Sequence, residues 1–382
     1  MYWGSTGTCP IQMLSSIRVI TFSKVVSKPF ISVFPEDLPA DEDLLAFDLR
    51  GDKFSTRCQT ALVSRVVDKI YGNPDQYDNV SSLYCGTDCS PPLSYPPQKT
   101  GVLSLSALTP AVDIDVGKIE AICTFNNFTP NSLQLGPHDV TVENPAALYL
   151  LPSLFNHACS ANAIWHCIGD AMIIRATTDI AEGNEVTIPY ACGDSYRERL
   201  NALEVYIPNG CDCHLCEEDR EDGEEAVKRR ERLISELCKS RITQSPALER
   251  ARELVNEMEA TYSPMRSIVR PQMGFARNLI AVLLHELAYE AEERLWPTYF
   301  EAAIEEQFLA LESVGMKVTD KAKRGPIHGT AMPIAANQIP TFVPHEQCVS
   351  HMISLAYSFH VLKERQRASI WIKTAAWGEL FR

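Results

Sequence analysis

Three cysteines lie within six residues near the middle of the chain, and such a group restricts how this region can fold. They are Cys211, Cys213 and Cys216, in the string CDCHLC. Thiolates at this spacing can converge on one zinc ion, each at about 2.3 Å, in a tetrahedral site. His214 is a poor fourth ligand, because it would have to fold back on the same short turn. The sequence therefore predicts a fourth ligand from elsewhere, with Cys159 as the obvious candidate. The alternative interpretation is three ordinary buried cysteines.

Cys159 lies in a compact cluster of polar residues. The string NHACSAN begins at Asn156 and directly follows the apolar run AALYLLPSLF. Amide, imidazole and thiol groups bind metals and make hydrogen bonds, whereas a buried strand normally ends in turn residues. The pattern predicts a functional turn here, although a single histidine such as His157 is more often structural.

The cysteine content indicates a reducing environment. The chain has 13 cysteines, an odd number that argues against a pure disulfide framework. Its N-terminus has neither the basic start nor the continuous apolar core of a signal peptide. We therefore expect the nucleus or cytoplasm rather than secretion. No stretch approaches the ~18 uncharged apolar residues of a membrane span, so no membrane association is expected.

The charge balance limits the partners. A net charge of -14 disfavours binding to the phosphate backbone of nucleic acids. It suits a protein substrate whose exposed lysine lies in a basic segment, because complementary charge accelerates encounter. Solubility alone is the other interpretation of this charge.

Hydrophobic patterns divide the chain into regions. β-Branched and aromatic residues over 20–34 predict one or two strands, and the spacing over 56–71 predicts a helix. Residues 72–115 are rich in Pro, Ser, Asp and Asn and predict a loop-rich insertion. The string IWHCIGDAMIIRA predicts a hairpin that turns at Gly169 and Asp170. The clearest helical patterns beyond residue 224 cover 245–262, 277–295, 297–313 and 347–381.

Three strings together resemble a known family. NHACSAN resembles the Asn-His-x-Cys-x-x-Asn core motif of SET-domain protein-lysine methyltransferases. DIAEGNEVTIPY resembles their second core segment, in which a strand ends in a tyrosine, and RERLNALEVYIPNGCDCHLC resembles their post-SET link. The pattern is closest to fungal TPR-and-SET proteins, which are related to the SET-and-MYND subfamily, but the chain has no MYND finger. The resemblance is strong over about 119–219.

This resemblance implies an α+β fold class. It implies a SET domain over 20–210, interrupted by the loop-rich insertion at 72–115. The SET-type β-fold would thread the chain through a pseudoknot. A post-SET zinc element would follow at 211–219, and a helical C-terminal domain, which could consist of helical repeats, at 224–382.

The resemblance also implies residue roles. Asn126, Asn156 and His157 would contact the cofactor S-adenosyl-L-methionine, with His157 contributing mostly backbone groups. Tyr190 would contact the cofactor and be the catalytic residue, although a tyrosine at a strand end is usually a half-buried core residue. Cys159, Cys211, Cys213 and Cys216 would bind zinc. The implied reaction transfers a methyl group to a protein lysine.

The sequence departs from the family at three points. The N-terminal Gly-x-Gly segment, which lines the cofactor in relatives, is not visible. Asn209 stands where an aromatic residue is usual, with Tyr206 as a substitute, and Pro189 precedes Tyr190. These departures keep open an inactive or truncated SET scaffold that acts in protein–protein interaction. A zinc-dependent nucleic-acid module is disfavoured by the acidic balance.

Overall fold

The computed structural model describes most of the 382-residue chain. The described residues are 24–33, 57–86, 114–130, 145–168, 170–239, 245–267, 269–325, 332–335 and 345–379. They form two compact units. The first, here called the N-terminal unit, comprises Lys24–Asn156 and Trp165–Ile174, and the second, the C-terminal unit, includes His157–Ile164 and Arg175–Arg382.

The strands of the N-terminal unit begin close to where the sequence predicts them. The region over 20–34 contains β1 (Lys24–Ser27) and β2 (Ile31–Val33), which confirms two strands. The strand β4 (Ala146–Leu148) pairs antiparallel with β2 on one side and with β3 (Asn127–Phe128) on the other. All three residues of β4 are buried.

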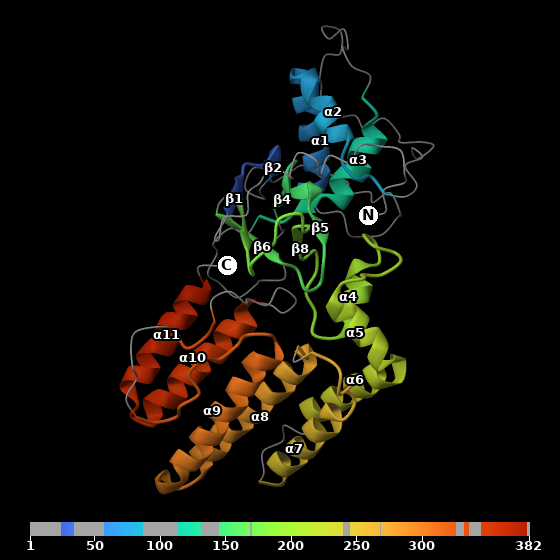
Figure 1. Ribbon diagram of the computed structural model, residues 1–382. Helices are drawn as coiled ribbons and strands as arrows, with labels where there is room; N and C mark the ends of the chain where they lie inside the picture. Colours follow the sequence, from blue (N-terminus) through green and yellow to red (C-terminus); the bar gives the residue numbers. More distant parts are fainter. Residues whose placement is uncertain are drawn as a thin grey trace. The chain divides into compact units, whose positions relative to one another are not determined.

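Helices complete the core of the N-terminal unit (Figure 1). The helix α1 (Arg57–Gly72) confirms the prediction over 56–71, and its face with Leu62, Val66 and Ile70 has no exposed surface. The helix α3 (Val116–Phe125) packs on α1.

The prediction of a loop-rich segment from residue 72 is wrong at its start. The short helices η3 (Pro74–Gln76) and α2 (Tyr77–Ser81) occupy the beginning of this segment. Proline at the first position of η3 begins a helical turn, because that position needs no amide donor. Residues 87–113 lie outside the described part of the chain.

The predicted hairpin is present. Its strands are β6 (Ala163–Ile168) and β7 (Ala171–Ala176), which lie side by side in a sheet of order β1-β7-β6. The turn is fixed to the core of the N-terminal unit by Tyr149, whose hydroxyl donates to the carbonyl oxygen of Asp170 at 2.6 Å. Gly169 itself lies outside the described residues.

A short two-stranded sheet and two helices follow. The strand β5 (Asn156–His157), whose first residue belongs to the N-terminal unit and whose second belongs to the C-terminal unit, pairs with β8 (Thr187–Ile188). The helix α4 (Tyr196–Leu203) begins with a capping box, in which the Ser195 side chain accepts from the Glu198 amide at 3.0 Å. The helix α5 (His214–Asp222) follows.

The rest of this unit is helical, as the patterns predict. Its helices are α6 (Glu224–Lys239), α7 (Ser245–Glu259), α8 (Pro271–Glu290), η6 (Glu293–Leu295), α9 (Trp296–Ser313), α10 (His345–Val361) and α11 (Arg365–Glu379). Successive helices from α6 to α11 pack side by side (Figure 1), and α6 also packs against α8. The α8–α9 crossing is close at Gly274, where a Cβ would lie 2.7 Å from Val314 Cγ1. The single helix predicted over 347–381 is wrong, because the chain breaks at Lys363, which has φ +64°.

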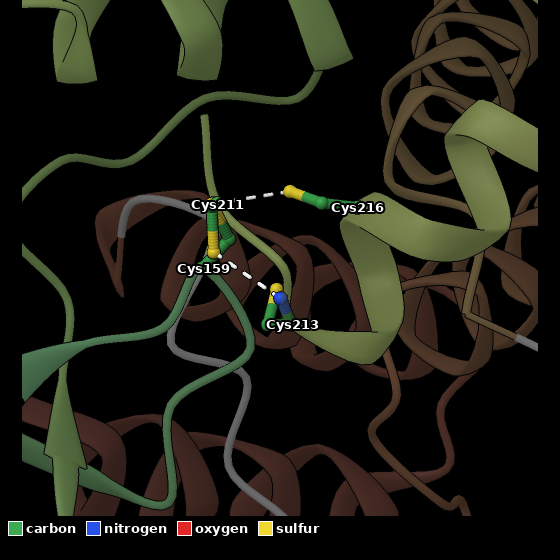
Figure 2. A group of neighbouring side chains, drawn as sticks. All are labelled: Cys159, Cys211, Cys213 and Cys216. Atoms are coloured by element: carbon green, nitrogen blue, oxygen red, sulfur yellow. Dashed lines mark hydrogen bonds between the residues drawn. The ribbon is translucent and has the colours of Figure 1, made fainter. Parts of the chain in front are cut away.

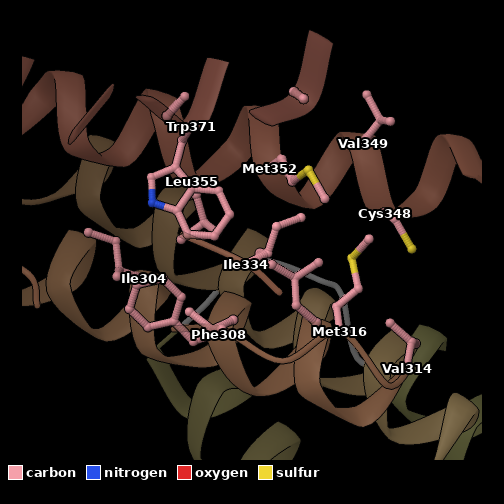
Figure 3. Close-up of a cluster of buried hydrophobic side chains, with 14 of the residues drawn as sticks. Ile304, Phe308, Val314, Met316, Ile334, Cys348, Val349, Met352, Leu355 and Trp371 are labelled. Carbon is pink, nitrogen blue, oxygen red and sulfur yellow. The ribbon is translucent and has the colours of Figure 1, made fainter. Parts of the chain in front are cut away.

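A hydrophobic core joins the last three helices to the cysteine region. It contains Phe308 of α9, Leu355 of α10 and Trp371 of α11, all buried (Figure 3). Cys159 and Cys216 belong to the same buried cluster. The strands and helices together confirm the α+β class. No helix in the described part of the chain is long and apolar enough to cross a membrane.

Candidate functional site

Four cysteine side chains converge within the C-terminal unit. Cys159 lies in the turn after β5, Cys211 and Cys213 precede α5, and Cys216 lies in its first turn. Their sulfur atoms all lie within 4.8 Å of one another, and the Sγ atoms of Cys159 and Cys216 are 3.5 Å apart (Figure 2). All four are free of disulfides. The structure therefore brings together the four residues that the sequence predicts as zinc ligands.

The geometry of these sulfur atoms suits a tetrahedral metal. Ligands at about 2.3 Å from zinc would lie about 3.8 Å from each other, close to the separations found here. The hydrogen bonds between the sulfur atoms favour two thiolates. Hydrogen bonds with Cys159 hold the pKa of Cys211 far below its usual value and lower the pKa of Cys213 to about 6. Hydrogen bonds with Cys211 and Cys213, together with burial, raise the pKa of Cys159 and of Cys216. At neutral pH the cluster therefore carries negative charge in a buried place, which a cation would neutralise.

The turn before α5 positions two of the sulfur atoms. Gly210 has φ +78°, a backbone conformation that favours glycine, and it directs the chain into Cys211. The backbone amide of Cys213 donates to Cys211 Sγ at 3.4 Å. The Arg220 guanidinium donates to the carbonyl oxygen of Cys211 at 2.7 Å from within α5. Hydrogen bonds to both the side chain and the backbone of Cys211 therefore hold this turn in place.

His157 lies between this cluster and Tyr190. Its Nδ1 atom accepts from the backbone amide of Tyr190 at 2.9 Å. In the neutral imidazole the proton is therefore on Nε2, which lies 3.3 Å from Cys159 Sγ and can donate to it. Both ring nitrogens are thus engaged. A role for His157 in cofactor contact remains a prediction, and it would use backbone groups.

Tyr190 follows the end of β8. Its ring packs at 5.2 Å from the His157 ring and at 5.9 Å from the Tyr206 ring. Burial, with smaller contributions from Glu185 and Tyr206, raises the pKa of Tyr190 to about 12. The phenol is therefore protonated at neutral pH and can donate or accept a hydrogen bond. Pro189 lies just beyond β8, where its missing amide removes no ladder hydrogen bond.

Asn126 and Asn156 belong to the N-terminal unit. Asn126 is buried at the end of α3, and its amide nitrogen donates to the carbonyl oxygens of Tyr84 at 2.7 Å and Ile122 at 2.8 Å. Asn156 is half-buried at the start of β5. Their contact with a cofactor stays a prediction.

One buried residue near the cysteines was not predictable from the sequence. Arg199 of α4 is fully buried and pairs with Asp219 of α5. The string RERL around it does not distinguish a buried arginine from an exposed one, and the partner lies 20 positions away. Only the three-dimensional fold brings the two together.

Comparisons with known proteins agree with the resemblance to SET-domain proteins. A sequence model of the SET domain matches residues 36–191. A Gibberella zeae protein named methyltransferase is 27% identical over 223 residues, which are 53% of this chain and 29% of that protein. The Homo sapiens histone-lysine N-methyltransferase SMYD3 is 31% identical over 120 residues, 31% of this chain and 26% of that protein. The Phaeosphaeria nodorum histone-lysine N-methyltransferase SET9 is 39% identical over 85 residues, 22% of this chain and 12% of that protein. The chain thus spans less than a third of each relative.

Proposed function

The chain carries a SET domain at residues 36–191, and from this premise we propose that it transfers a methyl group from S-adenosyl-L-methionine to a protein lysine. The observation that carries the proposal is the protonated, half-buried Tyr190, held at the end of β8 by a hydrogen bond to His157. Relatives named as histone-lysine methyltransferases support the same reaction.

The lysine substrate must reach the site as a neutral amine. A free lysine has a pKa of about 10.4 and is mostly charged at pH 7. Removing it from water lowers this pKa, because desolvation disfavours the ammonium. The Tyr190 hydroxyl would orient the lone pair of the amine, and holding the reacting groups in line would supply much of the rate. When bound, the cofactor supplies a methyl group on a positively charged sulfur. Asn126, Asn156, His157 and Tyr190 are the residues proposed to hold it.

Cys159, Cys211, Cys213 and Cys216 are proposed to hold zinc. Four cysteine ligands leave no open position, so the metal would stabilise the fold and not act on the substrate. This centre would be the post-SET element, and Cys159 would connect it to the turn that carries His157 in a pseudoknot.

The substrate is proposed to be a protein whose lysine lies in a basic segment. The net charge of -14 favours such a partner. We place the reaction in the nucleus or cytoplasm. The names of the relatives favour this enzyme over an inactive scaffold.

Calorimetry and a methyl-transfer assay test the proposal together. Titration of the full chain with S-adenosyl-L-methionine should give saturable heat. Incubation with the radiolabelled cofactor and a lysine-rich histone peptide should label the peptide, and Tyr190→Phe is the matched control with reduced labelling. No binding at millimolar cofactor would overturn the enzyme proposal and leave the scaffold.

A further inference from the structure

Arg199 connects three separate parts of the C-terminal unit. It projects from α4 with no exposed surface. Its Nη2 atom donates to Asp219 Oδ2 of α5. Its Nη1 atom donates to the backbone carbonyl oxygens of Gly193 at 3.2 Å and Asp194 at 3.3 Å. Gly193 and Asp194 follow Tyr190 by three and four residues, so one guanidinium holds α5 and the chain that leaves Tyr190.

Close packing fixes this arrangement further. A Cβ built on Gly193 would lie 3.1 Å from Glu198 Cβ and 3.3 Å from Arg199 Cγ. The segment after Tyr190 therefore folds tightly against the first turn of α4, and a larger side chain at 193 would push the backbone away from the guanidinium.

The charge of Arg199 complements the cysteine cluster. Four thiolates around one Zn²⁺ leave a formal charge of about −2, which is costly in a buried place. Burial tends to lower the pKa of Arg199, but the negative charge of Asp219 outweighs it, with coulombic contributions from Cys216 and Cys159, and raises this pKa. Arg199 is thus positively charged, and its charge can partly balance the negative charge of the zinc–thiolate centre.

A second buried arginine, which pairs with the same helix α5, provides a comparison. Arg230 of α6 is also fully buried, and its Nη1 atom donates to Asp222 Oδ2 at 2.7 Å, about one turn further along α5. Its Nη2 atom lies 3.8 Å from Asp219 Oδ1, an ion pair without a hydrogen bond. Its guanidinium stacks on the Tyr262 ring at 4.0 Å. In the described residues it donates no hydrogen bond to the chain between 190 and 216.

We propose that Arg199 is a positioning residue that holds the segment after Tyr190 against the zinc centre and offsets the charge of its thiolates. This inference rests on the proposed zinc site. Outer groups that orient or neutralise metal ligands commonly change metal affinity by 10–100-fold. Loss of Arg199 should therefore release zinc and loosen the Tyr190 segment together, whereas loss of Arg230 should only destabilise the helices.

The experiment compares Arg199→Met with Arg230→Met in the full chain. Zinc release to a chromogenic chelator is timed under native conditions, after the zinc content of the unsubstituted chain has been measured. Arg199→Met should release zinc about tenfold faster or more. Arg230→Met should stay within about twofold of the unsubstituted chain, although both variants lose thermal stability. Equal release rates in the two variants would overturn the proposal.

Arg199→Lys separates charge from hydrogen bonding and serves if Arg199→Met does not fold. The lysine keeps the cation but cannot reproduce the planar fork of the guanidinium. Its zinc release should be close to that of the unsubstituted chain, while the amides of residues 191–195 should exchange hydrogen faster, because their local opening becomes easier. Unchanged exchange would refute the positioning role. Absence of zinc from the unsubstituted chain would overturn the metal proposal and this inference with it, but would leave cofactor binding to be judged by calorimetry.

Discussion

His157 offers a sharp test of the link between the cysteine cluster and Tyr190, because its two nitrogens have different partners. Nδ1 accepts from the Tyr190 amide at 2.9 Å, and Nε2 lies 3.3 Å from Cys159 Sγ. The amide of asparagine can occupy the place of Nδ1, and the amide of glutamine can occupy the place of Nε2. His157→Asn should therefore keep the contact with Tyr190, and His157→Gln should keep the contact with sulfur.

The magnitudes follow from the two hydrogen bonds. Loss of an acceptor leaves a buried amide unsatisfied, which costs about 1–3 kcal/mol. If the loss of this hydrogen bond displaces Tyr190 and raises the barrier to methyl transfer by the same free energy, His157→Gln should lower the rate of methyl transfer about 5- to 150-fold. A hydrogen bond to a charged group is worth about 1.5–3 kcal/mol, so His157→Asn should weaken zinc binding about 10- to 100-fold.

Two assays on each variant separate the effects. Zinc affinity is measured by competition with a chelator, and methyl transfer is measured at saturating zinc and cofactor. His157→Asn should fail mainly in the first assay and His157→Gln mainly in the second. If both variants lose the same property to the same extent, the bridging role deduced from the geometry is refuted.

Three further predictions concern other groups. Cys213→Ser should lower the zinc content below one per chain and lower the melting temperature, because site formation and folding are coupled; unchanged stoichiometry in metal analysis would remove Cys213 from the site. Tyr190→Phe should reduce turnover about 100-fold with cofactor affinity nearly unchanged, and equal turnover would remove its catalytic role. Burial lowers the pKa of His351 from 6.5 to about 4. As the pH falls, His351 is protonated in the unfolded chain at a higher pH than in the folded chain. The full contribution of His351 to the free energy of unfolding should therefore be present above pH 6.5, and about 3 kcal/mol should be lost as the pH drops toward 4. His351→Leu should remove this part of the pH dependence in urea unfolding, and an unchanged slope would show that another group is responsible.

The helix over 56–71 and the hairpin were predictable, because the residue patterns that specify them lie within a short stretch of the chain. The helix over 56–71 was predictable because its apolar residues recur on one face, and Leu62, Val66 and Ile70 are indeed buried. The hairpin was predictable from two apolar runs around a turn. The break at Lys363 was not, because no glycine or proline marks it and only packing of α10 against α11 requires the reversal.

The metal site was predictable, because a tetrahedral zinc ion needs one more ligand than the cysteine triplet provides. Three cysteines in one turn needed a fourth ligand, and this pointed to Cys159, 57 residues before Cys216. Arg199 could not be predicted in the same way. A buried arginine needs a carboxylate, but many carboxylates in this acidic chain could serve, and only the fold selects Asp219. The two ring contacts of His157 also depend on the pairing of β5 with β8.

The central claim is that Cys159 and the distant cysteine triplet bind one metal ion beside Tyr190. X-ray absorption at the zinc edge of the purified full chain measures this directly. The account predicts one zinc per chain with four sulfur neighbours at about 2.3 Å, and three sulfur neighbours in Cys159→Ser. A chain without stoichiometric zinc, or a sulfur count that Cys159→Ser leaves unchanged, would contradict it.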